Sequence, residues 1–348
     1  IYSDSNVENY VIAKINSTYD VNISKDKKTI FTSPLEDLHK TWHKTSYEIQ
    51  KLRDNTDTAE SEFSKIGHKD NKGLYINKSF SDPDVNKVFS ISKTRPKIAI
   101  LREQGVNGHY EMANAFSENG FDAVDVTMNS LVIKENNLDD FQGAVFCGGF
   151  SYGDVLGAGR GWANKILHND ILMTSFSDYF NNLDKFALGI CNGCQTLSNL
   201  KSIIPGSENW PSFIQNKSER FESRITMVAV EKSNSIFLTD MNGSKLPIVI
   251  SHGEGRANLS ENEYIKLHDN NKICMNYIDD YGSITENYPC NPNGSYKGIA
   301  GVSSSSGNVT LMMPHPERLM NIKQFPTRDS EIISPWSKFF YNARMHLK

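Results

Sequence analysis

Two short segments of the sequence carry the side-chain types used in covalent catalysis. The segment GICNGCQ contains Cys191 and Cys194, and the segment MPHPERL contains His315 and Glu317. A thiol, an imidazole and a carboxylate can act as a nucleophile, as the base that activates it, and as the group that orients the base. The first question is therefore whether one of the two cysteines is a nucleophile.

The cysteine pair has three other interpretations. A redox pair would also place its first thiol at a helix N-terminus, but Asn192 and Gly193 between the thiols are more typical of a tight turn that displays one residue. A zinc site needs a second close pair of ligands, and Cys274 and Cys290 lie far apart. Both cysteines could also be small buried side chains, as free cysteines often are.

The surrounding glycines favour a nucleophile. The pattern G-x-C-x-G-x-Q predicts a sharp turn from a strand into a helix, as G-x-S-x-G does around hydrolase serines. Such a turn exposes the sulfur of Cys191, and the helix dipole favours its thiolate. The backbone N–H of Asn192 then points to where an oxyanion would form.

The segment around His315 offers the base and its orienting group. Prolines 314 and 316 stiffen the backbone there. Side chains two positions apart on an extended chain share a face, so Glu317 can hold the His315 imidazole in one tautomer. Alone, the two could be ordinary polar loop residues. Together with the turn at Cys191, they predict a Cys191–His315–Glu317 triad.

The elements that position these residues alternate along the chain. Short apolar segments predict strands, in order PKIAIL, FDAVDVTM, GAVFCGGF and FALGIC, and the segments HYEMANAFSENG, GRGWANKILHN and CQTLSNL predict helices between and after them. This alternation predicts a parallel sheet covered by helices on both faces. The later segments ITMVAV, LPIVISHGEG and VTLMMPHPER predict further strands, some of them antiparallel. Sites in such sheets gather beyond the carboxyl ends of the strands.

The first 95 residues or so differ from the rest, being rich in Lys, Asn, Asp and Ser. Their strongest pattern, PLEDLHKTWHKTSYEIQKLRDN at 34–55, predicts a helix that Pro34 can open. We expect one or two helices on a tether, without a core of their own.

Composition excludes several classes of protein. The chain has 348 residues, of which 38% are hydrophobic and 22% charged, as in globular proteins. The net charge of -4 argues against a general nucleic-acid surface, and no apolar run approaches the roughly 18 residues that span a bilayer. Five scattered cysteines form no disulfide framework, which favours a reduced, cytoplasmic setting.

Beyond these patterns, eight blocks resemble, in order, the glutaminase domain of the formylglycinamidine ribonucleotide (FGAM) synthases of purine biosynthesis, a class I glutamine amidotransferase. They are GGFSYGDVLGAGRGWA, GICNGCQ, IPGSENWP, NKSERFESR, SHGEGR, YPCNPNGS, MPHPER and SPWSKFFYNAR. The resemblance implies a flavodoxin-like α/β fold over 94–348, with a mostly parallel sheet and helices on both faces. A short, mainly helical or irregular segment at 1–93 would precede it.

The segment TWHKTSYEIQKLRDN is similar to a region near the end of the ATP-using part of the large, single-chain synthases. Residues 1–93 are thus expected to be the C-terminal remnant of the synthase region and a linker. The resemblance implies that ATP and magnesium bind upstream of Ile1, and that the glutaminase itself needs no metal or organic cofactor.

The resemblance also implies roles for individual residues. Cys191, His315 and Glu317 would be the catalytic triad. The backbone N–H groups of Gly149, Phe150 and Asn192 would form the oxyanion hole, and Gln195, His252 and Gly253 would contact glutamine. Cys194 would be a packing residue. Six residues match family blocks without an individual role: Arg102, Glu103, Asn107, Arg160, Glu254 and Arg256.

The implied reaction is glutamine hydrolysis through a thioester on Cys191. The ammonia would serve the ATP-dependent conversion of formylglycinamide ribonucleotide to the amidine. The expected partners are glutamine and the upstream synthase region of the same polypeptide, with no nucleic acid and no membrane. Two alternatives remain open from the residues: a stand-alone cysteine hydrolase on the same fold, and an inactive regulatory or interaction module.

Overall fold

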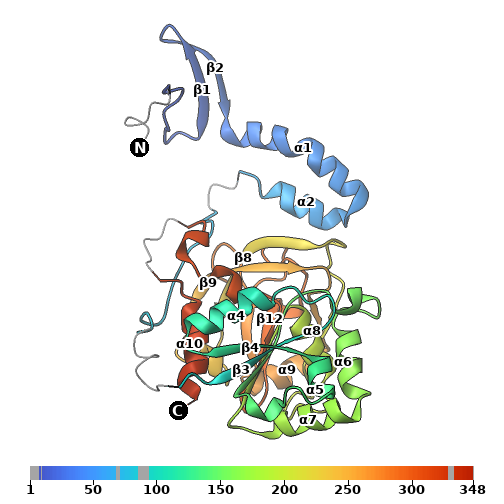
Figure 1. Ribbon diagram of the computed structural model, residues 1–348. Coiled ribbons are helices and arrows are strands. Elements are labelled where there is room, and N and C mark those ends of the chain that lie inside the picture. The colour runs from blue at the N-terminus through green and yellow to red at the C-terminus, as the bar shows by residue number, and fades with distance from the viewer. Residues whose placement is uncertain (1–7, 9, 68–70, 85–93, 328–332, 348) are drawn as a thin grey trace. The chain divides into compact units, whose positions relative to one another are not determined.

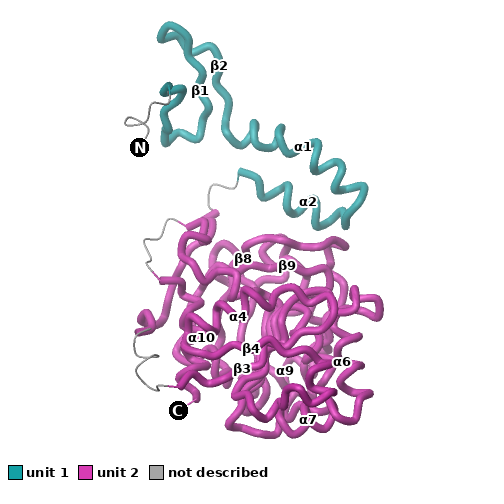
Figure 2. Tube along the Cα trace, in the orientation of Figure 1, with its two compact units in different colours: residues 1–70 teal, residues 71–348 magenta. Residues whose placement is uncertain are grey.

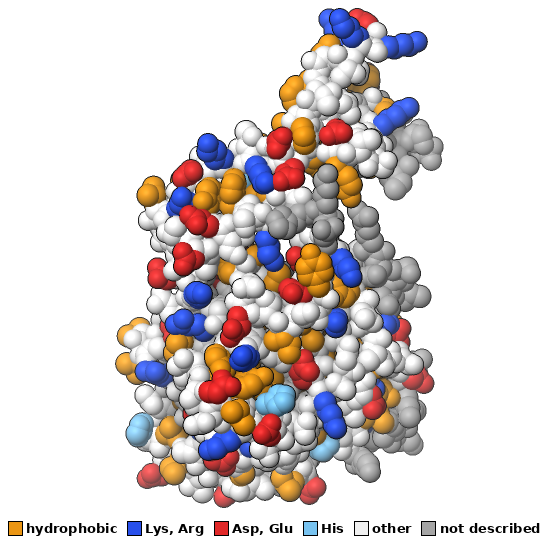
Figure 3. Space-filling view, turned by 180° about the vertical axis from the view of Figure 1, so that it is seen from behind, with side chains coloured by type: hydrophobic (Ala, Val, Ile, Leu, Met, Phe, Trp, Pro, Cys, Tyr) orange, Lys and Arg blue, Asp and Glu red, His pale blue; other side chains and the backbone are white. Residues whose placement is uncertain are grey.

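The computed structural model describes residues 8, 10–67, 71–84, 94–327 and 333–347 (Figure 1). The chain divides into two compact units, 1–70 and 71–348 (Figure 2). In the part that the structure describes, no helix combines the length and apolarity needed to cross a membrane. Acidic and basic side chains are interspersed over the face shown in Figure 3, in keeping with the small net charge of -4.

The first unit contains a hairpin and two helices. Strand β1 (Asp20–Lys25) pairs antiparallel with β2 (Lys28–Pro34), and the helices α1 (Leu35–Arg53) and α2 (Thr56–Ser64) follow. The helix predicted at 34–55 is confirmed as α1, but the sequence analysis missed the hairpin. No residue of α1 is buried, which agrees with the expectation that this region lacks a core of its own.

The second unit begins before the boundary that the resemblance suggests. Ile76 and Phe80 pack against its hydrophobic core, and Asn77 exchanges backbone hydrogen bonds with Lys245 at 3.0 and 2.9 Å. The described residues of 71–84 therefore pack with the second unit.

A nine-stranded sheet forms the centre of the second unit, in the order β4-β3-β5-β6-β13-β12-β11-β8-β9. The first five strands are mutually parallel: β4 (Asp122–Thr127), β3 (Lys97–Arg102), β5 (Gly143–Phe146), β6 (Phe186–Ile190) and β13 (Val309–Met312). The other four extend the sheet with antiparallel pairing: β12 (Ile299–Ser303), β11 (Ile273–Tyr277), β8 (Glu222–Val230) and β9 (Lys245–His252). The predicted fold class is thereby confirmed, including antiparallel strands late in the chain.

Aromatic contacts show that helices cover both faces of this sheet. On one face, Phe146 of β5 packs against Trp162 of α6 (Arg160–Leu167) and Phe176 of α7 (Asp170–Asn181), with ring centroids 5.2 and 5.6 Å apart. On the other face, the ring centroid of Phe186 of β6 lies 6.3 Å from that of Phe116 of α4 (His109–Glu118). Strands buried on both faces read as continuous apolar runs, as β5 and β6 do here.

The helices of the second unit have these bounds: α4 (His109–Glu118), α5 (Met128–Val132), α6 (Arg160–Leu167), α7 (Asp170–Asn181), α8 (Asn192–Asn199), α9 (Glu261–Asp269) and α10 (Ser337–His346). Short 3₁₀ turns are η1 (Leu138–Asp140), η2 (Ser151–Asp154), η3 (Ile236–Leu238), η4 (Tyr296–Gly298), η5 (Pro316–Leu319) and η6 (Ile322–Gln324). A small separate pair, β7 (Ser212–Ile214) and β10 (Arg256–Asn258), lies outside the main sheet.

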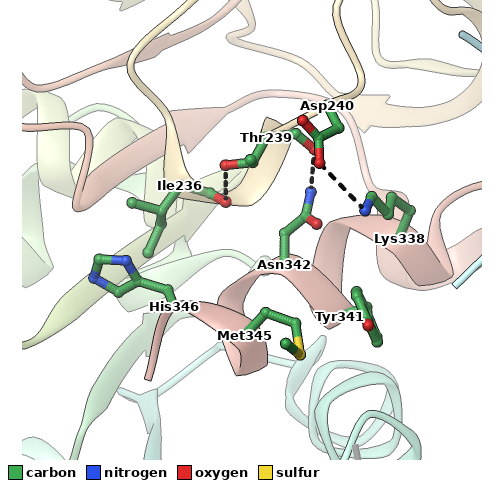
Figure 4. A pocket seen from close by; sticks show the side chains of 8 residues that line it. All are labelled: Ile236, Thr239, Asp240, Lys338, Tyr341, Asn342, Met345 and His346. Atoms are coloured by element: carbon green, nitrogen blue, oxygen red, sulfur yellow. Dashed lines mark hydrogen bonds and ion pairs between the residues drawn. The ribbon is translucent and has the colours of Figure 1, made fainter. Parts of the chain in front are cut away.

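The buried amide of Asn342 joins α10 to the loop after η3, beside a pocket that contains no residue of the predicted site (Figure 4). Its Nδ2 donates to Phe237 O at 3.0 Å and to Thr239 O at 2.7 Å. A buried carbonyl group has lost its hydrogen bonds to water. Without a donor in the protein, this loss raises the free energy of the folded state.

We predict that Asn342→Ala lowers the free energy of unfolding of the second unit. The change leaves the buried Phe237 O without its side-chain donor, which costs about 1–3 kcal/mol. Urea unfolding followed by tryptophan fluorescence measures this, because the tryptophans of this unit are at most 1% exposed whereas Trp42 of the first unit is 83% exposed.

The matched control is Asn181→Ala. The Asn181 amide also donates to a backbone carbonyl, Ser177 O at 2.8 Å, but on the exposed surface of α7. We expect a change within about 0.5 kcal/mol there. Equal effects of the two substitutions would contradict the role assigned to Asn342.

Candidate active site

The sheet brings the two segments predicted to be catalytic together at the carboxyl ends of β6 and β13. These strands are parallel neighbours, with Ile190 opposite Met312. Cys191 directly follows β6, and its N–H donates to Met312 O at 3.0 Å. His315 follows β13, and its N–H donates to Val249 O at 2.8 Å. Segments far apart in the sequence thus end within one small region.

Cys191 occupies the sharp turn between β6 and α8 that the glycine pattern predicts. Its φ of 53° and ψ of -108° are rare for a residue with a side chain, and such strained residues cluster at functional sites. The turn depends on close backbone contacts, because a Cβ on Gly193 would lie 1.9 Å from Phe146 O and one on Gly189 would lie 2.7 Å from Gly193 O.

The thiol and the imidazole line the same confined space. A Cβ on Gly148 would lie 2.8 Å from His315 Cε1 and 3.4 Å from Cys191 Cβ. The thiol donates to Ser251 O at 3.3 Å, and the buried Nε2 of His315 has no hydrogen-bond partner among the described residues. This nitrogen is therefore available to a proton of the thiol or of a substrate. Cys191 is only 6% exposed.

Glu317 holds the imidazole from its other side. His315 Nδ1 donates to Glu317 Oε1 at 2.6 Å, and both side chains are buried. Burial by itself lowers the pKa of His315, but the Glu317 carboxylate and the neighbouring Cys191 side chain raise it to about 9. The imidazole is thus protonated at neutral pH and can act as an acid toward a leaving group.

The loop after β5 lies against the start of α8. Asn192 Nδ2 donates to Asp154 Oδ1 at 3.0 Å, and the N–H of Ser151 donates to Asn192 Oδ1 at 3.2 Å. Tyr152, Gly153 and Asp154 follow one another in left-handed conformations, with φ of 54°, 63° and 52°. Burial raises the pKa of Asp154. The side chain of Asn192 therefore fixes a strained loop beside Cys191.

The predicted oxyanion donors differ in their availability. Asn192 is the first residue of α8, where backbone N–H groups have no acceptor within the helix. The N–H of Phe150, in contrast, donates to Gly105 O at 2.9 Å. Gly149 has a φ of 151° and no room for a side chain, since a Cβ would lie 2.5 Å from Val106 Cα. In this arrangement the Phe150 N–H is occupied, and it would need to leave Gly105 O to serve an oxyanion.

The three predicted glutamine contacts gather where β9 ends. Gln195 Nε2 donates to Glu254 O at 2.7 Å, and His252 Nε2 accepts a hydrogen bond from Asn293 Nδ2 at 3.3 Å. Both side chains are buried, and burial lowers the pKa of His252 to about 4. Gly253 is partly exposed. Gln195 and His252 thus have protein partners here, and Gly253 O accepts from the N–H of Asn216 at 2.9 Å.

Of the residues left without a role, three contact the loops of the site. Glu254 Oε2 accepts from the N–H of Ala158 at 3.2 Å, and the N–H of Asn107 donates to Gly148 O at 3.2 Å. Arg160 is exposed at the start of α6 and lies beside Gly157, where a Cβ would come within 3.2 Å of its side chain.

The other three residues without a predicted role are Arg102, Glu103 and Arg256. Arg102 pairs with Asp125 at 2.6 Å, and Glu103 pairs with Lys165 at 2.6 Å. The Nε of Arg256 is buried without a hydrogen-bond partner in the described part of the chain.

Cys194 is fully buried, and burial raises the pKa of its thiol well above the ordinary value, which suits a packing residue. The described residues contain no group of three or more His, Cys, Asp or Glu side chains arranged to hold a metal ion.

Three further residues of this site were not predicted from the sequence. Ser251 accepts the thiol hydrogen through its carbonyl oxygen, and Asn216 and Asn293 contact the turn that follows it. All three belong to blocks on which the resemblance rests, namely SHGEGR, NKSERFESR and YPCNPNGS. Their place in these blocks marked the three residues in the sequence, but it did not show which groups they contact.

Comparison with known proteins places the chain in a family. Residues 95–347 match the profile of the CobB/CobQ-like glutamine amidotransferase domain. The chain is 48% identical over 337 residues to a phosphoribosylformylglycinamidine synthase from Saccharomyces cerevisiae (strain ATCC 204508 / S288c), a match covering 92% of this chain and 25% of that protein. The chain thus spans about a quarter of that relative's length, and the resemblance of its sequence blocks to FGAM synthases is confirmed.

A solved structure supports the same assignment. The structure of PurLQS from Thermotoga maritima aligns with a TM-score of 0.55 and 25% identity, over 72% of this chain and 98% of the matched chain. The matched profile covers most of the chain, including Cys191, His315 and Glu317. The chain therefore belongs to the CobB/CobQ-like glutamine amidotransferase domain family.

Proposed function

We propose that the chain is the glutaminase part of a phosphoribosylformylglycinamidine synthase. It hydrolyses glutamine and supplies ammonia for the ATP-dependent conversion of formylglycinamide ribonucleotide to formylglycinamidine ribonucleotide. The observation that carries this proposal is the buried arrangement of Cys191, His315 and Glu317 beyond parallel strands, in a chain 48% identical to the yeast synthase.

The first half of the reaction forms a thioester. In the reactive form the proton of Cys191 resides on His315 Nε2, in keeping with the raised pKa of that imidazole, and the thiolate attacks the side-chain amide carbon of glutamine. The tetrahedral intermediate carries an oxyanion, which the N–H of Asn192 stabilises. The intermediate collapses as His315 returns the proton to the leaving nitrogen. Ammonia departs, and the glutamyl group remains on the sulfur.

The second half releases glutamate. The neutral His315 takes a proton from a water molecule, whose oxygen attacks the thioester carbon. The second oxyanion occupies the same position as the first, and its collapse breaks the C–S bond. The thiolate leaves and the imidazolium returns its proton to the sulfur or remains paired with it. Throughout, Glu317 keeps the imidazole in place through the 2.6 Å contact to Nδ1.

Further contacts to the bound substrate are part of the proposal. We propose Gly149 and Phe150 as additional oxyanion donors, with the Phe150 N–H leaving Gly105 O. Gln195, His252 and Gly253 are proposed to contact glutamine. Because Cys191 is only 6% exposed, glutamine entry requires the neighbouring loops to open. Phe150 and Phe221, both exposed and with ring centroids 6.0 Å apart, lie on loops beside the site.

The domain assignment is part of the proposal. Residues 94–348 are the amidotransferase domain, which the profile match to 95–347 supports. Residues 1–93 are a remnant of the synthase region and a linker, and the yeast match supports this because its 92% coverage of the chain reaches beyond the profile. ATP and magnesium would bind in the synthase region, and the glutaminase would use neither. We also propose a cytoplasmic location, because the five cysteines are free and the cytoplasm keeps thiols reduced.

We predict that Cys191→Ser abolishes glutamine hydrolysis, whereas Cys194→Ser retains most of it. A hydroxyl is a much poorer nucleophile in a site built for a thiolate. A glutamine-like diazo-ketone should label Cys191 alone, as measured by mass spectrometry of tryptic peptides. Labelling found chiefly on Cys194 would overturn the assignment. Glutamine as the preferred substrate among simple amides would separate this proposal from a general cysteine hydrolase.

We predict that the imidazole of His315 titrates near pH 9 and that Glu317→Gln lowers its pKa. The raised pKa stabilises the folded chain below the unfolded value of about 6.5, and this stabilisation is lost as the pH rises through about 9. Histidine NMR titration measures the pKa, with the signal assigned by its absence in His315→Gln. A midpoint near 6.5 that Glu317→Gln does not move would contradict the pairing.

We predict that this chain alone releases glutamate at least about tenfold more slowly than the full-length synthase with its nucleotides bound, since one oxyanion donor is worth about 10²–10³ in rate. The physical reason is the Phe150 N–H, which here donates to Gly105 O. Steady-state glutamate release from both proteins under matched conditions is the measurement. Equal rates would contradict the coupling and would leave the triad assignment intact.

A further inference from the structure

Two sequence blocks that the proposed mechanism does not use meet at one turn of the active site. NKSERFESR begins at Asn216, and YPCNPNGS contains Asn293. Both asparagines are buried, at 2% and 0% exposure. The side-chain amide of each forms hydrogen bonds to residues 252–255, which form the turn at the end of β9. A buried amide is costly unless its hydrogen bonds are made, so these contacts specify the turn.

Asn216 holds both ends of this turn. Its Nδ2 donates to His252 O at 2.8 Å, and its Oδ1 accepts from the N–H of Gly255 at 2.9 Å. Its backbone N–H donates to Gly253 O at 2.9 Å. Asn216 thus forms hydrogen bonds to backbone groups of three of the four residues in the turn.

Asn293 holds the turn from another side. Its Nδ2 donates to Gly255 O at 2.8 Å and to His252 Nε2 at 3.3 Å. Its Oδ1 accepts from the N–H of Ser295 at 3.0 Å and from the Ser295 hydroxyl at 2.7 Å. The His252 ring is therefore held as a neutral acceptor and cannot turn freely.

The 252–255 turn and the residue before it contact Cys191 and Gln195 through two backbone carbonyl groups. Ser251 O, just before the turn, accepts the hydrogen of the Cys191 thiol at 3.3 Å. Glu254 O, within the turn, accepts from Gln195 Nε2 at 2.7 Å. A shift of the turn would therefore move the acceptor of the thiol and the partner of a proposed glutamine contact together.

We propose that Asn216 and Asn293 are positioning residues for the nucleophile: they hold the 252–255 turn so that Ser251 O and Glu254 O orient Cys191 and Gln195. This inference rests on the proposed glutaminase function. Neither asparagine is proposed to contact the reacting atoms.

An ionic cluster ties the two blocks together around this turn. Glu222, only 1% exposed, accepts from Arg220 Nε at 3.1 Å and pairs with Arg224 at 2.8 Å. The hydroxyl of Tyr288, from the second block, accepts from both arginines at 2.5 and 2.6 Å. Glu222 also stands opposite His252 in the β8–β9 register. The cluster therefore fixes the ends of the segments that carry the asparagines.

The test compares Asn216→Ala with Asn342→Ala in the full-length enzyme. Asn342 is a matched control, because its buried amide also donates to two backbone carbonyls, at a place outside the site (Figure 4). We expect Asn216→Ala to lower kcat/KM for glutamine at least about tenfold, since small misplacements of reacting groups cost up to about 10²-fold. The loss should be mainly in kcat, and diazo-ketone labelling of Cys191 should slow in parallel. The control should keep glutaminase activity within about twofold.

Two further measurements separate positioning from a loss of folded protein. Activity with added ammonium in place of glutamine should be unchanged in Asn216→Ala. If Asn216→Ala does not fold, Asn293→Asp takes its place, because it keeps the acceptor for Ser295 and removes the donors to Gly255 O, His252 Nε2 and the Tyr277 hydroxyl. It should show the same selective loss.

The outcomes distinguish the two proposals. A loss of glutaminase activity no larger than that of Asn342→Ala would overturn the positioning role and leave the proposed function standing. Equal losses with glutamine and with ammonium would also overturn it, because they would indicate a general structural effect. A wild-type enzyme that hydrolyses no glutamine would overturn the proposed function itself, and with it this inference.

Discussion

The contact between the backbone of α8 and the end of β5 is the constraint on which the site depends. Gly193 lies so close to Phe146 O that a Cβ there would come within 1.9 Å. This approach lets the chain turn from β6 into α8 within one residue, and it places Cys191 at a φ of 53°. The thiol is consequently held between the first N–H groups of α8 and the segments that carry His315 and Ser251. The apolar contacts on both faces of the sheet stabilise the strands that make this turn possible.

Two buried histidines in the same region show how neighbours decide protonation. Burial lowers the pKa of both, and His252, whose Nε2 partner is the neutral amide of Asn293, has a pKa of about 4. His315 has a carboxylate as its partner, and its pKa is raised to about 9. The same desolvation therefore yields a neutral ring in one case and an imidazolium in the other. This difference suits a structural role for His252 and proton transfer for His315.

Much of the fold and of the site could be predicted because local patterns report them. Alternating apolar and amphipathic segments predicted the parallel strands and their helices, and the glycines around Cys191 predicted its turn. The hairpin before α1 was missed because its turn residues, Asp26 and Lys27, adopt φ of 50° and 65° without the Asn-Gly or Gly signal typical of such turns. The hydrogen bond from Phe150 to Gly105 could not be predicted, since it joins two loops that meet only in the folded chain. The contacts of Asn216 and Asn293 could not be predicted for the same reason.

The most direct test of the account is to trap the covalent intermediate. The protein would be mixed with isotope-labelled glutamine, quenched in acid within the first turnovers, and digested for mass spectrometry. The account predicts a glutamyl thioester on the peptide that contains Cys191, located at that residue by fragmentation and absent from Cys191→Ala. Glutamate release with no adduct at Cys191, or an adduct on another residue, would contradict it.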